Sequence, residues 1–172
     1  ILIADDEAII RLGLKSMLEE LGHQVMTATN GREALRMAER RAPDLAILDI
    51  HMPYTDGLQA ARAMTAARPL PILILTAFSQ QALVERAADL PIQGYLVKPV
   101  RPEELGAAIT VAVRRFKDSQ AQAARTARLE AELATRKLLD RARGKLMDRG
   151  LSEEDAYRAI QDRVRRERKK VV

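Results

Sequence analysis

The sequence predicts an α/β protein: a doubly wound, five-stranded parallel sheet, followed by a long helix and a small all-α domain. Short apolar runs alternate with segments of helical period in the first two thirds of the chain, a pattern typical of parallel strands joined by helices. A proline-free stretch from Glu103 to Arg149, rich in Ala, Leu, Arg and Glu, predicts one long helix or two nearly continuous ones.

Five apolar runs are expected to form the strands. They cover residues 1–4, 24–28, 44–49, 71–77 and 94–98. Three of them hold continuously apolar stretches, at 1–4, 45–48 and 72–75, as expected when helices cover both faces of a sheet. In a sheet of this kind with the strand order 2-1-3-4-5, the first and third strands are neighbours beside the point where the strand order reverses.

The segments between these runs carry the signals of helices. Helices are expected over 7–21, 32–41, 57–67 and 80–89, and from Pro102 onward. Asn30-Gly31 opens the second helix, Asp56 is expected to be a turn or N-cap residue before the third, and Ser79 is expected to cap the fourth. A proline is favoured in the first turn of a helix, which suits Pro102.

Composition excludes several classes of protein. The chain of 172 residues contains no Cys, so it has neither a disulfide framework nor a thiolate metal site. No stretch reaches the roughly 18 apolar residues of a membrane span, and we expect a cytoplasmic protein without a membrane partner. The chain begins inside the first predicted strand and without Met, so we expect residues to precede it.

Charge is distributed unevenly along the chain. Residues 1–117 hold 14 Lys and Arg against 14 Asp and Glu, whereas residues 118–172 hold 15 against 10. A neutral body with a basic tail indicates that the tail meets an anionic partner.

Polar residues at the ends of the predicted strands form the candidate site. Asp5 and Asp6 follow the first strand, Asp49 ends the third, Thr76 the fourth and Lys98 the fifth. Ligands of such sheets bind at the carboxyl ends of the strands. Crowded carboxylates need a cation, and an oxygen-only ligand set suits Mg²⁺ or Mn²⁺. A lysine and a threonine hydroxyl suit the oxygens of a phosphoryl group.

Each of these residues also has a structural interpretation. Asp5, Asp6 and Glu7 are acids at the start of a helix, where they interact favourably with its dipole, and Glu7 is expected to do only that. Taken alone, Thr76 is also explained as an ordinary strand residue and Lys98 as a surface charge. The presence of these residues together with Asp49 at the strand ends favours a binding site for a cation and a phosphoryl group.

Four motifs carry a resemblance to a known family: ADDE, LDIHMPYTDG, ILTAFS and YLVKP. With these motifs in this order, residues 1–117 resemble a response-regulator receiver domain of two-component signalling, which has a flavodoxin-like fold. The resemblance implies that Asp49 accepts a phosphoryl group from a sensor histidine kinase. It also implies that Lys98 and Thr76 contact the phosphoryl oxygens, and that Thr76 and Tyr95 form a switch.

The resemblance also implies a ligand set for Mg²⁺ and a cis Lys98-Pro99 bond. Asp6 and Asp49 would bind the ion directly, Asp5 through water, and His51 through its backbone carbonyl. One departure from the family is Leu90-Pro91-Ile92, where a proline would stiffen the loop before the fifth strand.

The tail resembles a second family. The stretch TRKLLDRARGKLMDRGLSEEDAYRAI, residues 135–160, is similar to the ANTAR domain, an RNA-binding output module of antitermination regulators. Gly150 is expected just after a helix, and Ser152 with Asp155 resembles a capping box. Over residues 135–172 the family's third helix is not recognisable, so the domain is expected to be truncated.

The basic residues of this tail are the candidate RNA contacts. They are Arg136, Lys137, Arg141, Arg143 and Lys145. Tyr157 is expected to be a core residue and not a stacking platform. Residues 118–134 are expected to be a helical connector, and their alanine-rich apolar stripe suits either a short dimeric coiled coil or a solvated helix.

The sequence therefore predicts a phosphorylation-dependent response regulator, and not an enzyme, that binds RNA hairpins to control transcription antitermination. Phosphorylation of Asp49 would favour a homodimer through the long helix. Two alternatives keep the receiver and change the output: a protein-interaction or dimerisation element, or a DNA-binding element.

Overall fold

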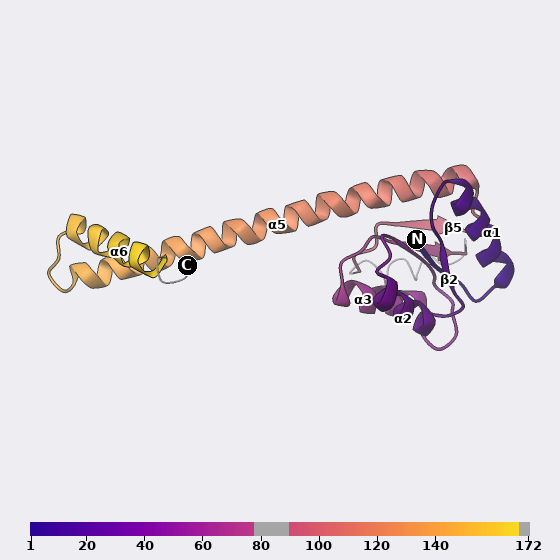
Figure 1. Cartoon of the computed structure of the whole chain (residues 1–172), viewed down its shortest axis with the longest axis horizontal. Coiled ribbons are helices and arrows are strands. Elements are labelled where there is room, and N and C mark those ends of the chain that lie inside the picture. The colour runs from indigo at the N-terminus through magenta and orange to yellow at the C-terminus, as the bar shows by residue number, and fades with distance from the viewer. Residues whose placement is uncertain (78–89, 169–172) are drawn as a thin grey trace. The chain divides into compact units, whose positions relative to one another are not determined.

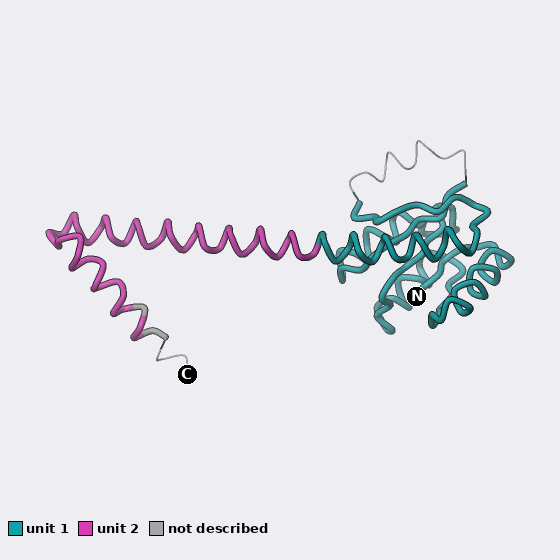
Figure 2. Tube along the Cα trace, turned by 90° about the horizontal axis from the view of Figure 1, so that it is seen from above, with its two compact units in different colours: residues 1–119 teal, residues 120–172 magenta. Residues whose placement is uncertain are grey.

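The computed structural model describes residues 1–77 and 90–168 of the chain. The chain divides into two units, residues 1–119 and residues 120–172 (Figure 2). The predicted helix over 80–89 and its cap, Ser79, lie outside the described residues.

The first unit is built on a five-stranded parallel sheet in the order β2-β1-β3-β4-β5, which confirms the predicted order. The strands are β1 (Leu2–Ala4), β2 (Met26–Ala28), β3 (Ala46–Asp49), β4 (Ile72–Thr76) and β5 (Gly94–Val97). Each lies within one of the apolar runs. Since successive strand residues point to opposite faces, Ala46 and Leu48 belong to the core on one face and Ile47 to the core on the other.

Helices cover both faces of this sheet (Figure 1). They include α1 (Ala8–Glu20), α2 (Gly31–Arg41) and α3 (Gly57–Ala67). The core on one face includes residues of α2 and α3. The core on the other includes Leu14 and Leu18 of α1. Both sides of the sheet are therefore buried, and the one charged residue within its described strands, Asp49, lies at the end of β3.

Side chains cap α2 and α3 as the sequence predicts. The Asn30 side chain accepts a hydrogen bond from the Glu33 amide at 2.9 Å, and Asp56 accepts one from the Gln59 amide at 2.7 Å. Asp56 is thus an N-cap. These bonds satisfy amide groups that have no partner inside the helix.

The long helix is a single element, α5 (Pro102–Met147), and it begins at the predicted proline. Within the first unit, its residues Leu105, Ile109 and Ala112 are buried in the core that contains α1. Among the described residues, no helix is both long enough and apolar enough to cross a membrane.

The second unit contains the end of α5 and a following helix, α6 (Glu153–Arg168). Gly150 has a φ of +93° in the turn between them, a conformation that glycine adopts without steric cost. The Ser152 hydroxyl accepts a hydrogen bond from the Asp155 amide at 3.2 Å, and it donates one to the Asp155 carboxylate at 2.6 Å. The capping pair is therefore present, although the acid binds the hydroxyl and not the backbone.

The expectation that Tyr157 is a core residue is wrong, because its surface is 57% exposed. Ala156 occupies the face of α6 that is fully buried. The next residue of a helix lies about 100° further around its axis, so Tyr157 turns away from that contact.

Candidate functional site

The strand ends bring the predicted pocket residues together. Ala4 of β1 pairs with Leu48 of β3, so the residues that follow them, Asp5 and Asp49, lie beside each other. On the opposite side of β3, β4 ends at Thr76, which pairs with Val97 directly before Lys98. Three acids, a threonine and a lysine therefore meet at one edge of the sheet.

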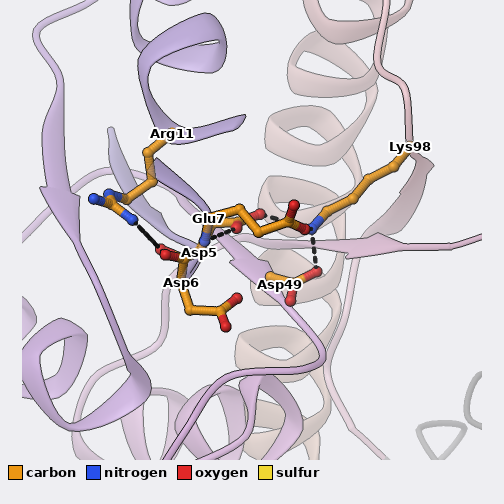
Figure 3. Close-up of polar contacts among 6 residues, drawn as sticks. All are labelled: Asp5, Asp6, Glu7, Arg11, Asp49 and Lys98. Atoms are coloured by element: carbon orange, nitrogen blue, oxygen red, sulfur yellow. Dashed lines mark hydrogen bonds and ion pairs between the residues drawn. The ribbon is translucent and has the colours of Figure 1, made fainter. Parts of the chain in front are cut away.

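Lys98 joins the two buried acids. Its Nζ lies 2.8 Å from Asp5 Oδ2 and 2.8 Å from Asp49 Oδ1 (Figure 3). Asp5 is 0% exposed and Asp49 is 5% exposed, so water screens these charges weakly. The ammonium is thus held between strands β1 and β3 and can reach any group bound to Asp49.

Burial and neighbouring charges shift the pKa values of this pair. Burial raises the pKa of Asp49, Lys98 opposes the shift, and the charges of Asp5 and Asp6 add to it. Burial by itself would lower the pKa of Lys98, but its bonds to Asp49 and Asp5 outweigh burial and raise it. Lys98 is therefore a protonated donor at neutral pH.

The three aspartates fit a divalent cation. Carboxylate oxygens of Asp5, Asp6 and Asp49 lie within 4.8 Å of one another. Asp5 Oδ2 is buried and, apart from its ion pair with Lys98, accepts no hydrogen bond among the described residues. Lys98 Nζ lies within ion-pair distance of three carboxylates, those of Asp5, Glu7 and Asp49, and Asp6 adds a fourth acid to the cluster. An all-oxygen donor set with excess negative charge is suited to Mg²⁺.

The start of α1 fixes the acidic segment. Asp5 Oδ1 accepts from the Glu7 amide at 2.9 Å. Arg11 Nη1 donates to the backbone carbonyls of Asp5 at 2.8 Å and Asp6 at 3.0 Å (Figure 3). Glu7 precedes α1 without capping it, and its carboxylate lies 3.7 Å from Lys98 Nζ. Glu7 therefore also contributes charge to the pocket.

Sequence reasoning missed Arg11. One signal was available, because a cation in the first turn of a helix is unfavourable for the helix dipole. An arginine in that position indicates a partner outside the helix.

Gly57 is a second residue that sequence reasoning did not place at the site. It begins α3, and its amide donates to the Ile50 carbonyl at 3.0 Å. A Cβ at this position would lie 2.0 Å from the Asp49 carbonyl oxygen. Only glycine allows the start of α3 to approach the backbone of Asp49 this closely.

The two residues of the predicted switch lie on adjacent strands. Thr76 is buried at the end of β4, and its hydroxyl donates to the Ala77 carbonyl at 3.1 Å. Tyr95 lies on β5 and packs partly buried against the core that contains α2 and α3, and this burial raises its pKa. The Lys98-Pro99 bond is cis, as the resemblance implies.

The candidate RNA contacts lie in the second unit, and they do not share one environment. Arg136, Lys137, Arg141 and Lys145 are exposed, whereas Arg143 is half-buried. Arg143 forms ion pairs with Asp140 at 3.7 Å and with Glu153 of α6 at 3.1 Å. Arg143 therefore links α5 to α6, while the other four are open to a partner.

A groove of about 460 Å³ lies between α5 and α6 in the second unit. Its lining combines apolar side chains with charged ones. The residues are Arg136, Leu139, Asp140, Arg143, Tyr157, Ile160, Gln161 and Arg165. The exposed ring of Tyr157 belongs to this lining.

A doubly wound sheet with three aspartates and a lysine at its carboxyl edge defines the class of receiver domains. Residues 1–110 match the response regulator receiver domain family, and residues 127–172 match the ANTAR domain family. The chain therefore belongs to the response regulators and carries a receiver domain and an ANTAR output domain.

Individual relatives agree with this assignment. The transcriptional regulatory protein PdtaR of Mycobacterium tuberculosis is 46% identical over 163 residues, which cover 94% of this chain and 80% of the relative. The probable transcriptional regulator ycf27 of Guillardia theta is 40% identical over 115 residues, covering 67% of this chain and 45% of that protein. The 163-residue match to PdtaR is longer than the first unit and therefore extends into the second.

Solved structures match about two thirds of the chain. A response regulator receiver domain protein from Clostridium thermocellum superposes with a TM-score of 0.63 at 32% identity, covering 67% of this chain and 94% of that chain. NtrX from Brucella abortus gives a TM-score of 0.65 at 26% identity, covering 71% of this chain and 28% of that chain.

Proposed function

We propose that Asp49 accepts a phosphoryl group from a sensor histidine kinase, and that the C-terminal unit binds RNA hairpins to control transcription antitermination. One observation carries the first half: Lys98 Nζ lies 2.8 Å from Asp49 Oδ1, in a pocket that contains two further aspartates. In this proposal residues 1–117 are the receiver, 118–134 the connector and 135–172 the output domain.

The proposed reaction is transfer from a phosphohistidine to a carboxylate. An Asp49 oxygen forms a bond to phosphorus while the bond from phosphorus to the histidine nitrogen of the donor breaks, and the imidazole leaves with that electron pair. Lys98 contacts an oxygen of the arriving group, and the Thr76 hydroxyl donates to another. Positioned charges of this kind are the main source of catalysis in phosphoryl transfer.

Mg²⁺, with Mn²⁺ as a substitute, fits the same pocket. Asp6 and Asp49 would hold it directly, together with the His51 backbone carbonyl, and Asp5 would act through water. When bound, the ion reduces the repulsion between the carboxylates and the phosphoryl oxygens. Thr76 and Tyr95 would then report the modification to the surface around β5.

Phosphorylation of the full chain by acetyl phosphate tests the first half. The unmodified chain should gain one phosphoryl group that base and hydroxylamine remove, as expected of an acyl phosphate, in the presence of Mg²⁺, and Asp49→Asn should gain none. Asp44→Asn is the matched control, because Asp44 is an exposed aspartate at the start of the apolar run 44–49 that ends at Asp49. This variant should be labelled normally. Labelling of Asp49→Asn at the normal rate would show that the acceptor is wrong.

The RNA-binding half rests on the ANTAR match and on the exposed basic residues of α5. Arg136, Lys137, Arg141 and Lys145 are available for phosphate contacts, whereas the ion pairs of Arg143 favour a structural role. Leu129 and Leu133 are exposed on α5, and in the proposal they support a homodimer that forms on phosphorylation.

Binding of the full chain to a hairpin RNA, measured at several salt concentrations, tests the output. The affinity should fall steeply between about 50 and 200 mM salt. Arg136→Ala should reduce the slope of log affinity against log salt by about one. Arg114→Ala removes an exposed arginine of the same helix inside the first unit, and it should leave the slope unchanged. Salt-independent binding would refute the phosphate contacts.

A further inference from the structure

The loop that follows the phosphoacceptor contains a γ-turn centred on Tyr54. The Thr55 amide donates to the Pro53 carbonyl at 2.9 Å, and the φ of Tyr54 is +70°. Turns of this kind are rare and strained, and a bulky residue at positive φ adds to the strain. Conformations of this kind persist only where surrounding contacts hold them.

Helix α2 supplies those contacts. The Arg32 guanidinium lies over the Tyr54 ring, 5.7 Å from its centroid, within the range of a cation–π interaction. One residue earlier, a Cβ on Gly31 would lie 2.4 Å from the Thr55 carbonyl oxygen. The start of α2 therefore packs directly against the loop and also holds the ring of its strained residue.

The same loop is closed at its base beside Asp49. The Gly57 amide donates to the Ile50 carbonyl at 3.0 Å, so residues 50–57 form one ring of backbone. His51, whose carbonyl is a ligand in the proposed function, lies inside this ring. Tyr54 is 81% exposed, so core packing does not explain a tyrosine at this position.

We propose that Tyr54, held by Arg32, is a positioning residue that keeps the loop in the conformation in which the His51 carbonyl can bind Mg²⁺. The inference rests on the proposed function, because it takes the acidic pocket as the ion site. Without the ring contact the strained turn relaxes, and the binding-competent fraction of the loop falls. The apparent dissociation constant rises by the same factor.

The test is a Mg²⁺ titration of the full chain, followed by backbone amide NMR shifts. Tyr54→Ala removes the ring, keeps a Cβ at the strained position and leaves the charge unchanged, and it should weaken Mg²⁺ binding about two- to five-fold, the range for an exposed cation–π contact. Tyr54→Phe keeps the ring and should restore the affinity. Arg32→Ala should also weaken Mg²⁺ binding, because it removes the cation that holds the Tyr54 ring. Loss of a positive charge by itself would strengthen Mg²⁺ binding. Arg40→Ala, which removes a positive charge from the same helix without touching the ring, measures that charge effect.

Thermal unfolding of the same variants separates positioning from folding. Glycine adopts positive φ freely, so Tyr54→Gly, which removes the strain together with the ring, should be at least as stable as the unmodified chain and should bind Mg²⁺ more tightly than Tyr54→Ala. Equal Mg²⁺ affinity in Tyr54→Ala and the unmodified chain would overturn the inference. Failure of the proposed ion site is recognised differently: Asp6→Asn would then bind Mg²⁺ as tightly as the unmodified chain.

Discussion

Replacement of Gly57 by alanine tests how closely α3 is packed against the phosphoacceptor. The added Cβ would lie 2.0 Å from the Asp49 carbonyl oxygen and 2.8 Å from its carbonyl carbon, both closer than the 3.0 Å limit that real Cβ atoms keep. The obstacle is backbone, so it cannot rotate away as a side chain can. Either α3 or the end of β3 must move by about 1 Å.

The sign of the change in unfolding free energy depends on two opposing effects, helix propensity and overpacking. Alanine is favoured over glycine within a helix by up to about 1 kcal/mol, whereas overpacking a well-filled site costs about 1–3 kcal/mol. Because the contact is with backbone, we take the upper end of that cost, and the net loss of unfolding free energy is about 2 kcal/mol. Gly13→Ala in α1 has no atom within 4 Å of its Cβ and should gain up to about 1 kcal/mol.

Urea unfolding, followed by the amide signals of β3 and β4, measures both variants in the full chain. Phosphorylation by acetyl phosphate provides the functional readout, and Gly57→Ala should react more slowly because the Asp49 backbone is displaced. An unfolding free energy for Gly57→Ala equal to or above that of the unmodified chain would refute the steric argument. Unchanged labelling would show that the displacement spares Asp49.

Three further results are expected. Lys98→Met should slow labelling by acetyl phosphate about ten- to a hundred-fold, the effect of losing a charged hydrogen bond, and normal labelling would exclude Lys98 from the reaction. Asp6→Asn should be more stable than the unmodified chain in EDTA, because one of several like charges is removed, and it should lose most of the rise in melting temperature that Mg²⁺ produces; an undiminished rise would exclude Asp6 as a ligand. The backbone and hydroxyl of Thr29 lower the pKa of Glu33, so its stabilising contribution is present above the unfolded pKa and is lost as pH falls through the folded pKa. The difference in unfolding free energy between Glu33→Gln and the unmodified chain should therefore be larger at pH 7 than at pH 3, and a constant difference would contradict this.

The sheet was predictable because its signals are local. Each strand is an apolar run of the right length, and parallel pairing places every carboxyl end at one edge. That rule, together with the strand order 2-1-3-4-5, was enough to bring Asp5 and Asp49 to the same pocket as Lys98. The caps at Asn30 and Asp56 were predictable for the same reason, since their partners lie three residues along the chain.

Contacts that depend on exact packing were not predictable. The approach of Gly57 to Asp49 and of Gly31 to Thr55 involves backbone atoms whose distance no sequence pattern encodes. Tyr157 was misplaced because its position opposite the turn favoured a core residue, whereas here the small Ala156 provides the buried contact. The ion pair of Arg143 with Glu153 likewise depends on how α6 returns along α5.

The charge balance of the pocket connects its stability with its proposed chemistry. Lys98 offsets only part of the charge on the surrounding acids, and its ammonium is already shared between Asp5 and Asp49. Folding therefore brings like charges together at a cost, and the core on both faces of the sheet offsets that cost. A divalent cation that binds this pocket in the folded state, and not in the unfolded chain, stabilises the fold by relieving the same repulsion. The excess of acids lowers the stability of the fold when no cation is bound, and for the same electrostatic reason it favours binding of a hard divalent cation.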